Sequence, residues 1–410
     1  MKKCLFPALF FIFFIPPSKA QLYDLVLPKG VQQVDIPFSY ENDFIILNVL
    51  FNGTLPLRFI FDTGAEHTIL TKKAVTDLFQ VQYDRKFTIY GSDLSTVLYA
   101  YLARGITLKI DNLIATNRNI LVLEEDYFRF HEFAGLTVQG ILGSDLFRRF
   151  IVKINYKRQV ITFIDPSSFR PPGKSFSKMD IDLERHKPYI NTNIFVNADK
   201  KGVPARLLID TGASLSLLLY TNTDLNIELP PRVIRTNIGM GLGGFIQGAL
   251  GRIEQIDFEP FQLNGVVTNF QELDANLDSL RLVKRHGILG NHILSRFIIY
   301  IDYIKGTMYL KANRNLKTKF AYDRSGINVS ASGVELNVFT VFNVISDSPA
   351  AEAGIQTGDQ IRRINGWPAT FSSLGDVNRK LRARKGKKIK LIVDRNGEIL
   401  KVEFRLRDLI

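Results

Sequence analysis

The sequence predicts a mostly β protein, with two similar β-rich units followed by a smaller α+β domain. From residue 34 onward, short apolar runs alternate with Gly, Asn and Pro, which is typical of strands joined by turns. Several motifs recur at an offset of 147 or 148 positions. After residue 348, turn signals surround short helical patterns, so the chain ends in a different kind of domain.

The first unit, residues 21–170, is expected to begin with a hairpin. Apolar runs at 43–51 and 57–61 flank Asn52-Gly53, a pair that favours a tight turn because both residues tolerate positive φ. Short helices are expected at 72–78 and 145–150. The segment 166–173, rich in Pro and Ser, has linker composition.

The second unit, residues 171–315, repeats this order. Its hairpin is predicted from runs at 189–196 and 203–209, with a turn near 199–202. Three motifs of the first unit recur in it with nearly constant spacing: Asp62-Thr63-Gly64-Ala65 as Asp210-Thr211-Gly212-Ala213, Gly140-Ile141-Leu142-Gly143 as Gly287-Ile288-Leu289-Gly290, and 149–156 as 296–303. Conserved spacing between motifs indicates that a whole folding unit was duplicated.

The third unit, residues 320–410, contains a dense series of signals between 348 and 366. We expect a short helix ended by Gly354, a tight turn at Gly358-Asp359, a strand, and a hairpin turn at Asn365-Gly366. A second helix is expected after the capping-box pair Ser373 and Asp376, because apolar residues follow it at helical spacing.

The N-terminus has the features of a signal peptide, residues 1–20. Two lysines precede an apolar run at 5–15 that is too short to span a bilayer, and Ser18-Lys19-Ala20 offers a small-residue cleavage site. The single cysteine, Cys4, lies within this segment. The sequence therefore predicts an exported protein, bacterial periplasmic or secreted, with no membrane span.

The net charge of +13 raises the question of nucleic-acid binding. Eight Lys and Arg residues lie between 379 and 390, but no aromatic residues are interleaved with them for base stacking. We therefore favour a solvated basic helix end and loop, and expect no nucleic-acid partner.

The repeated Asp-Thr-Gly motif offers a chemical use for two carboxylates. Peptide hydrolysis without a metal or a covalent intermediate requires a nucleophilic water and a polarised carbonyl. Two carboxyls about 3 Å apart share one proton, so one member can act as a base and the other as an acid. The alternative is that Asp62 and Asp210 merely begin structural turns.

With its paired motifs, the chain resembles the aspartic peptidases, specifically a retropepsin-like lobe doubled in one chain, over residues 34–312. The resemblance implies two acid-protease β lobes forming a pseudo-dimer, expected to be a monomer with an internal pseudo-two-fold axis. It leaves open whether the lobes pair within one chain or between chains. Asp62 and Asp210 would be catalytic, supported by Thr63, Gly64, Thr211 and Gly212.

A glycine-rich segment at 238–247 resembles the flap of retroviral proteases. The resemblance assigns substrate contacts to Gly241 and Gly243, and to Tyr90 and Gly91 at the equivalent place in the first unit. The same segment matches Gly-x-Gly-x-x-Gly. However, a dinucleotide site requires a helix to follow, and the glycines that come next argue against one.

The segment 348–366 resembles a PDZ domain of the bacterial protease-associated kind. The resemblance implies a site for an extended peptide along the second helix of the domain. Its carboxylate-binding loop would be formed by Ser325, Gly326 and Ile327, although this stretch departs from the Gly-Leu-Gly-Phe form. A C-terminal peptide is therefore an expected partner beside the polypeptide substrate.

Other chemistries find little support. The five histidines show no metal-ligand spacing, no Gly-x-Ser-x-Gly motif occurs, and no cysteine remains after the signal segment, so we expect no cofactor and no metal. The sequence favours an aspartic endopeptidase. A non-catalytic envelope peptide-binding or scaffold protein is the main alternative, and a lectin-like β protein is the weakest because it explains neither aspartate.

Overall fold

The computed structural model describes residues 25–91, 96–197, 201–273 and 285–410, except for the side chain of Tyr90. The expected signal peptide, residues 1–20, lies outside this range. Among the described residues, no helix is both long and apolar enough to cross a bilayer.

The first lobe is an eight-stranded sheet. Its strands, in order across the sheet, are β2 (Ser39–Glu41), β3 (Phe44–Phe51), β4 (Leu55–Phe61), β9 (Gly140–Leu142), β5 (Ile69–Leu70), β8 (Leu113–Leu123), β7 (Val97–Ile110) and β6 (Tyr83–Tyr90). Three short helices accompany it: α1 (Lys73–Asp77), α2 (Phe130–Phe133) and α3 (Ser144–Phe147). The helices α1 and α3 lie where the sequence predicts them.

The second lobe repeats the same strand order. Its strands are β13 (Asp182–Glu184), β14 (Lys187–Phe195), β15 (Val203–Ile209), β20 (Gly287–Leu289), β16 (Leu217–Tyr220), β19 (Phe261–Gln271), β18 (Gly244–Phe258) and β17 (Val233–Gly241), with helix α5 (Asn291–Leu294). The duplication read from the motifs is therefore a duplication of the whole sheet.

A third sheet joins the lobes within one chain. Its order is β1 (Gln33–Pro37), β11 (Val160–Ile164), β10 (Ile151–Asn155), β21 (Phe297–Asp302), β22 (Thr307–Ala312) and β12 (Ser177–Asp180). The two halves meet where β10 pairs with β21, and the equivalent residues Lys153 and Tyr300 face each other there. The pseudo-two-fold axis therefore passes through this pair, and the two lobes form an internal pseudo-dimer.

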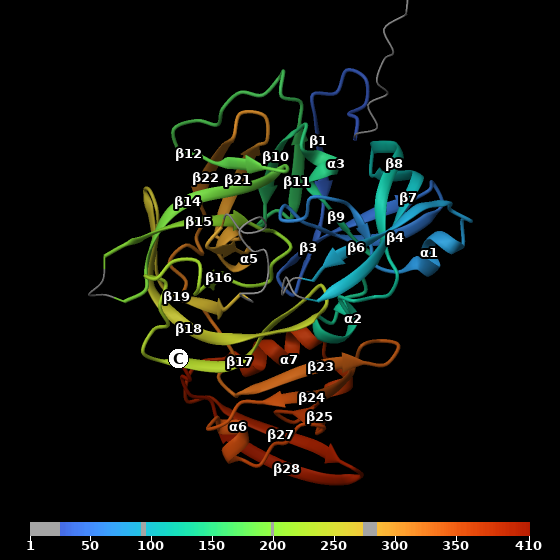
Figure 1. Cartoon of the computed structure of the whole chain (residues 1–410). Helices are drawn as coiled ribbons and strands as arrows, with labels where there is room; N and C mark the ends of the chain where they lie inside the picture. Colours follow the sequence, from blue (N-terminus) through green and yellow to red (C-terminus); the bar gives the residue numbers. More distant parts are fainter. Residues whose placement is uncertain (1–24, 92–95, 198–200, 274–284) are drawn as a thin grey trace, which may run out of the picture.

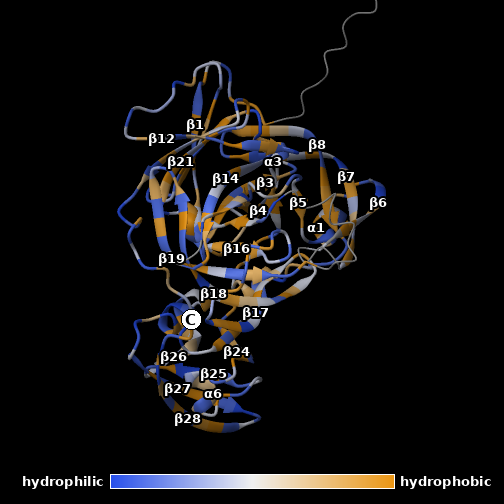
Figure 2. Cartoon of the chain, turned by 60° about the vertical axis from the view of Figure 1, so that its left-hand side comes forward, coloured by the Kyte–Doolittle hydropathy of each residue, from blue (hydrophilic) through white to orange (hydrophobic). Residues whose placement is uncertain are grey.

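The C-terminal domain has a six-stranded sheet and its own apolar core. Its elements are β23 (Ile327–Ser332), β24 (Val338–Val344), α6 (Pro349–Glu352), β25 (Gln360–Ile364), β26 (Trp367–Pro368), the 3₁₀ helix η1 (Ala369–Phe371), α7 (Leu374–Leu381), β27 (Lys388–Arg395) and β28 (Glu398–Arg405). Figures 1 and 2 both place this domain against the β17–β18 hairpin of the second lobe.

Local sequence signals explain several of these turns and caps. Asn52 and Gly53 have φ values of 46° and 75°, as the turn between β3 and β4 requires. Ser373 and Asp376 form the predicted capping box at the start of α7. The apolar stripe of α7 that follows this cap faces the core of the domain, where Val377 is fully buried.

Candidate active site

The two Asp-Thr-Gly loops begin where β4 and β15 end, close to the pseudo-two-fold axis. Behind each loop runs a parallel strand, β9 or β20, that contains the repeated Gly-Ile-Leu motif. The N–H of Asp62 donates to the carbonyl of Leu142 at 3.1 Å, and that of Asp210 to the carbonyl of Leu289 at 3.0 Å. The repeated motif thus fixes the backbone of each aspartate.

Thr63 and Thr211 lock the two loops together. The Oγ1 of Thr211 accepts the N–H of Thr63 at 3.0 Å, and the Oγ1 of Thr63 accepts the N–H of Thr211 at 3.1 Å. Each hydroxyl also donates across the axis, to the carbonyl of Ile209 at 2.7 Å and to that of Phe61 at 2.8 Å. Both threonines are fully buried, so these four hydrogen bonds hold the loops in one arrangement.

The glycines bring each carboxyl against the opposite loop. The N–H of Gly64 donates to Oδ1 of Asp62 at 2.7 Å, and the N–H of Gly212 does the same for Asp210 at 2.7 Å. A Cβ on Gly64 would lie 2.5 Å from Cγ of Asp210, and a Cβ on Gly212 would overlap the Asp62 carboxyl. Ala65 adds a second N–H to Oδ1 of Asp62, at 3.0 Å.

The electrostatics of this pair favour a shared proton. Burial raises the pKa of Asp62 well above its usual range, and the charge of Asp210 and a hydrogen bond with it raise it further. Burial also raises the pKa of Asp210, while its hydrogen bond with Asp62 and the N–H of Gly212 act in the opposite direction. Two carboxyls that interact so strongly hold one proton between them and titrate as a pair.

The sequence analysis missed two basic side chains that act on this pair. The charges of Arg285, just before β20, and Lys187, at the start of β14, favour the ionised form of Asp210 and lower its pKa. Nη2 of Arg285 donates to the hydroxyl of Tyr220 at 3.0 Å. Burial and the charge of Arg285 lower the pKa of Lys187. Lining up the two units would have shown these residues, because the first unit has none like them there.

Asn291 is a second residue that the sequence analysis left without a role. Its Nδ2 donates to the carbonyl of Thr211 at 2.6 Å and to that of Asp43 at 2.8 Å. Its Oδ1 accepts the hydroxyl of Tyr156 at 2.7 Å. This fully buried amide thus ties the second Asp-Thr-Gly loop to both lobes. Its position directly after the second Gly-Ile-Leu-Gly was the only signal for it.

The glycine-rich segment forms a hairpin, as a flap requires. Gly241 and Gly244 pair at its tip, and the turn contains Gly243 with φ of 100°. The strand β18 follows the glycines, so the helix needed for a dinucleotide site is absent here. A Cβ on Gly243 would lie 3.4 Å from Cα of Gly91, so the turn of this hairpin lies against the residue that follows β6 in the first lobe. The side chain of Tyr90 lies outside the described residues.

The loop before β23 differs from its expected form. Oδ1 of Asp323 accepts the N–H of Ser325 at 3.0 Å and that of Gly326 at 2.6 Å, and Oγ of Ser325 accepts the N–H of Ile327 at 3.1 Å. The three N–H groups assigned to a terminal carboxylate are therefore already bonded within the loop. The sequence analysis overlooked Asp323, which supplies the acceptor.

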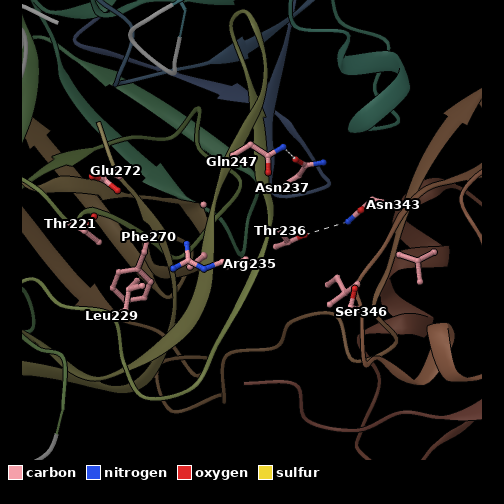
Figure 3. Close-up of a pocket in the computed structure, with 14 residues that line it drawn as sticks. Thr221, Leu229, Arg235, Thr236, Asn237, Gln247, Phe270, Glu272, Asn343 and Ser346 are labelled. Atoms are coloured by element: carbon pink, nitrogen blue, oxygen red, sulfur yellow. Dashed lines mark hydrogen bonds between the residues drawn. The ribbon is translucent and has the colours of Figure 1, made fainter. Parts of the chain in front are cut away.

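A cavity of about 590 Å³ lies between the second flap and the C-terminal domain (Figure 3). Arg235, Thr236 and Gln247 line it from the flap, and Asn343 and Ser346 line it from the other side. Thr236 and Asn343 are joined across it at 3.4 Å. The cavity does not include either aspartate, so it belongs to the contact between flap and domain.

The paired loops and the repeated β lobes have the arrangement of a duplicated, retropepsin-like aspartyl protease fold. Residues 47–146 and 196–293 each match the aspartyl protease family model, and both lobes belong to that family. Residues 322–406 match the PDZ domain model, which identifies the C-terminal domain. No curated protein matches the chain.

Proposed function

We propose that this protein is an aspartic endopeptidase whose Asp62 and Asp210 activate a water molecule for the hydrolysis of peptide bonds. The observation that carries this proposal is the interlocked pair of loops, in which each carboxyl lies against the glycine of the other lobe. A purely structural turn does not explain two half-buried carboxyls that lie together at the centre of the molecule.

The proposed reaction uses the single proton of the pair. The ionised carboxyl removes a proton from the water, while the protonated carboxyl donates to the carbonyl oxygen of the scissile bond. The resulting intermediate collapses when the protonated carboxyl gives its proton to the leaving nitrogen and the ionised carboxyl takes one back from a hydroxyl of the intermediate, which restores the single proton of the pair. Because the two groups titrate together, neither Asp62 nor Asp210 is assigned one role.

In this proposal, Gly91 and Gly243, which lie against each other, supply backbone groups on the side of the substrate opposite the aspartates. An extended polypeptide suits this arrangement because its backbone hydrogen bonds can be met by strand-like flaps. The PDZ domain adds a second site for polypeptide on the same chain. We further propose export to the bacterial periplasm or the medium, on the strength of the apolar leader at residues 1–20.

The test is hydrolysis of a broad peptide library by the full chain and by Asp62→Asn and Asp210→Asn. We expect each variant to lose activity by about 10²–10⁴-fold, because either change removes the shared-proton pair. Asp180→Asn, at a side chain that is 90% exposed, is the matched control and should behave like the parent.

Substantial activity in either variant would contradict the two-aspartate mechanism. A parent chain that binds peptides but hydrolyses none of them would instead favour a non-catalytic envelope peptide-binding or scaffold protein. Circular dichroism separates loss of chemistry from loss of folding.

A further inference from the structure

The peptide site of a PDZ domain is the strip between its first strand and its second helix, here β23 and α7. In this chain, residues 129–135 of the first lobe lie across that strip. Helix α2 packs against β23, as Figure 1 also shows. A Cβ on Gly135 would lie 2.8 Å from Cβ of Leu374, the first residue of α7, and Leu374 is only 2% exposed. The strip is therefore covered by the protein's own chain.

Further contacts extend this cover along α7. Asn42 of the first lobe lies directly against Gly375, and its Nδ2 donates to the carbonyl of Ala134 at 2.6 Å. Nη1 of Arg382, the residue that caps α7, lies 3.8 Å from Oδ2 of Asp43. Among the described residues, however, no backbone hydrogen bond joins α2 to β23, so the edge of that strand keeps its capacity to pair.

An aromatic cluster connects the cover to the flap. The ring of Phe133 lies 5.3 Å from that of Phe342 in the PDZ domain and 4.7 Å from that of Phe245 in β18. Phe245 and Phe342 are themselves stacked at 5.2 Å. Each such aromatic pair contributes about 0.5–1.5 kcal/mol beyond its buried area. One lobe, one flap and the PDZ domain thus meet at three rings.

The other end of the strip disfavours a chain terminus. The N–H of Arg324 donates to the carbonyl of Leu381 at 3.3 Å, which places the Asp323 loop at the C-terminal end of α7. Burial raises the pKa of Asp323 to about 6, so its carboxyl is largely ionised at pH 7. A terminal carboxylate would meet this like charge and find the backbone donors of the loop already in use.

We infer that the strip between β23 and α7 binds an internal segment of a partner polypeptide that places an aromatic side chain on Phe342, and that residues 129–135 hold this place in the free protein. The lobe segment enters and leaves the strip as continuous chain, as an internal segment of a partner would. The inference rests on the PDZ domain and its contacts, and it stands whether or not the aspartates hydrolyse peptides.

A partner that takes this place displaces Phe133 from both of its ring contacts. Among the ring contacts of the described residues, Phe245 then keeps its stacking on Phe342, and the contact that joined it to the first lobe is broken. Occupation of the PDZ site therefore uncouples the second flap from the first lobe at this cluster. By the same linkage, any change that weakens the contacts of residues 129–135 with the PDZ domain raises the apparent affinity for the partner.

The experiment uses the full chain with Asp62→Asn, so that no probe is cleaved. The probe is a fluorescent peptide of residues 126–135 with a blocked N-terminus, prepared as a C-terminal amide and as a free acid. Its affinity is measured by anisotropy at pH 7 for the Asp62→Asn chain alone and with Phe133→Ala added. We expect the amide to bind the Phe133→Ala chain about tenfold more tightly, since about 1.4 kcal/mol of internal competition is lost.

Phe371→Ala is the matched control, because this ring is 86% exposed on the same domain, and it should leave the affinity unchanged. With Phe133→Ala already in the chain, so that the internal competitor no longer contacts this ring, Phe342→Ala should weaken binding of both peptide forms. The free acid should bind no more tightly than the amide, and Asp323→Asn should strengthen binding of the free acid alone.

Two results would overturn the inference. One is tenfold tighter binding of the free acid than of the amide to the Asp323-containing chain. The other is that neither Phe133→Ala nor Phe245→Ala increases the affinity for the amide. Phe245→Ala removes a ring contact of Phe133 from the flap side, so it replaces Phe133→Ala if that variant folds poorly.

Discussion

The two lobes share one scaffold but surround their aspartates with opposite chemistry. Strand register and motif spacing make Phe44 equivalent to Lys187 and Val138 equivalent to Arg285. In the first lobe, Phe44 and Val138 belong to a buried apolar cluster. In the second lobe, Lys187 and Arg285 are the two cations that act on Asp210.

This comparison shows which positions kept the same residue in both lobes after the duplication and which positions diverged. The threonines that lock the loops are the same in both lobes, because both are needed for one symmetrical set of hydrogen bonds. The residues one layer further out differ, and the two cations that lower the pKa of Asp210 both come from the second lobe. Duplication in one chain allows each half to change alone, so the active site is symmetrical at its centre and asymmetrical around it.

The largest loss of hydrolytic activity is expected from substitutions in the two Asp-Thr-Gly loops, where the lobes are most alike. Gly64→Ala and Gly212→Ala should each reduce hydrolysis by at least about 100-fold, because a methyl group would displace the opposite carboxyl by an ångström or more. Hydrolysis of a common peptide by both variants is the measurement. Gly173→Ala, where a Cβ meets nothing within 4 Å, is the control. Loss of activity in only one variant would show that the two loops are not equivalent in the reaction.

A difference of stability is expected at the equivalent pair Tyr156 and Tyr303. Tyr156 donates to Asn291, so Tyr156→Phe leaves a buried amide oxygen unpaired and should cost about 1–3 kcal/mol of unfolding free energy. The hydroxyl of Tyr303 is buried and has no hydrogen-bond partner among the described residues, so Tyr303→Phe should be nearly neutral. Urea denaturation measures both. Equal losses would mean that the second hydroxyl is also satisfied.

The smallest effect concerns the pH dependence of the proposed hydrolysis. Lys187 and Arg285 lower the pKa of Asp210, so Lys187→Met with Arg285→Met should raise it. Because one member of the pair must be ionised, the acid limb of the kcat/KM profile should move to higher pH, and activity below that limb should fall. Lys305→Met, at an exposed turn residue, is the single-charge control. An unchanged or downward-shifted limb would show that the two cations do not act on the pair.

Motifs with local causes could be predicted from the sequence. The Asn52-Gly53 turn, the Ser373–Asp376 cap and the doubled strand order all follow from residue types at short spacing or from the repeat itself. The meeting of Asp62 and Asp210 followed from the resemblance to a family whose lobes pair. In each case, neighbouring residues or a repeated pattern carried the information.

The remaining features depend on contacts between distant segments. Asp323 accepts the N–H groups of its own loop because the chain turns back on itself there. A single aspartate two residues before Ser325 does not reveal these hydrogen bonds in the sequence. Phe133, Phe245 and Phe342 are far apart in the sequence, and each one alone reads as an ordinary apolar residue. Their meeting depends on how the PDZ domain docks on the lobes, which no local pattern encodes.

Because β10 pairs with β21 within one chain, assembly of the candidate active site does not depend on the protein concentration. When two separate chains must associate to bring their aspartates together, the active fraction falls as the protein is diluted. Here one chain carries both halves, and the covalent connection sets a high effective concentration of one lobe at the other. The site should therefore persist at the low protein concentrations that follow dilution, without the threshold that governs a two-chain enzyme.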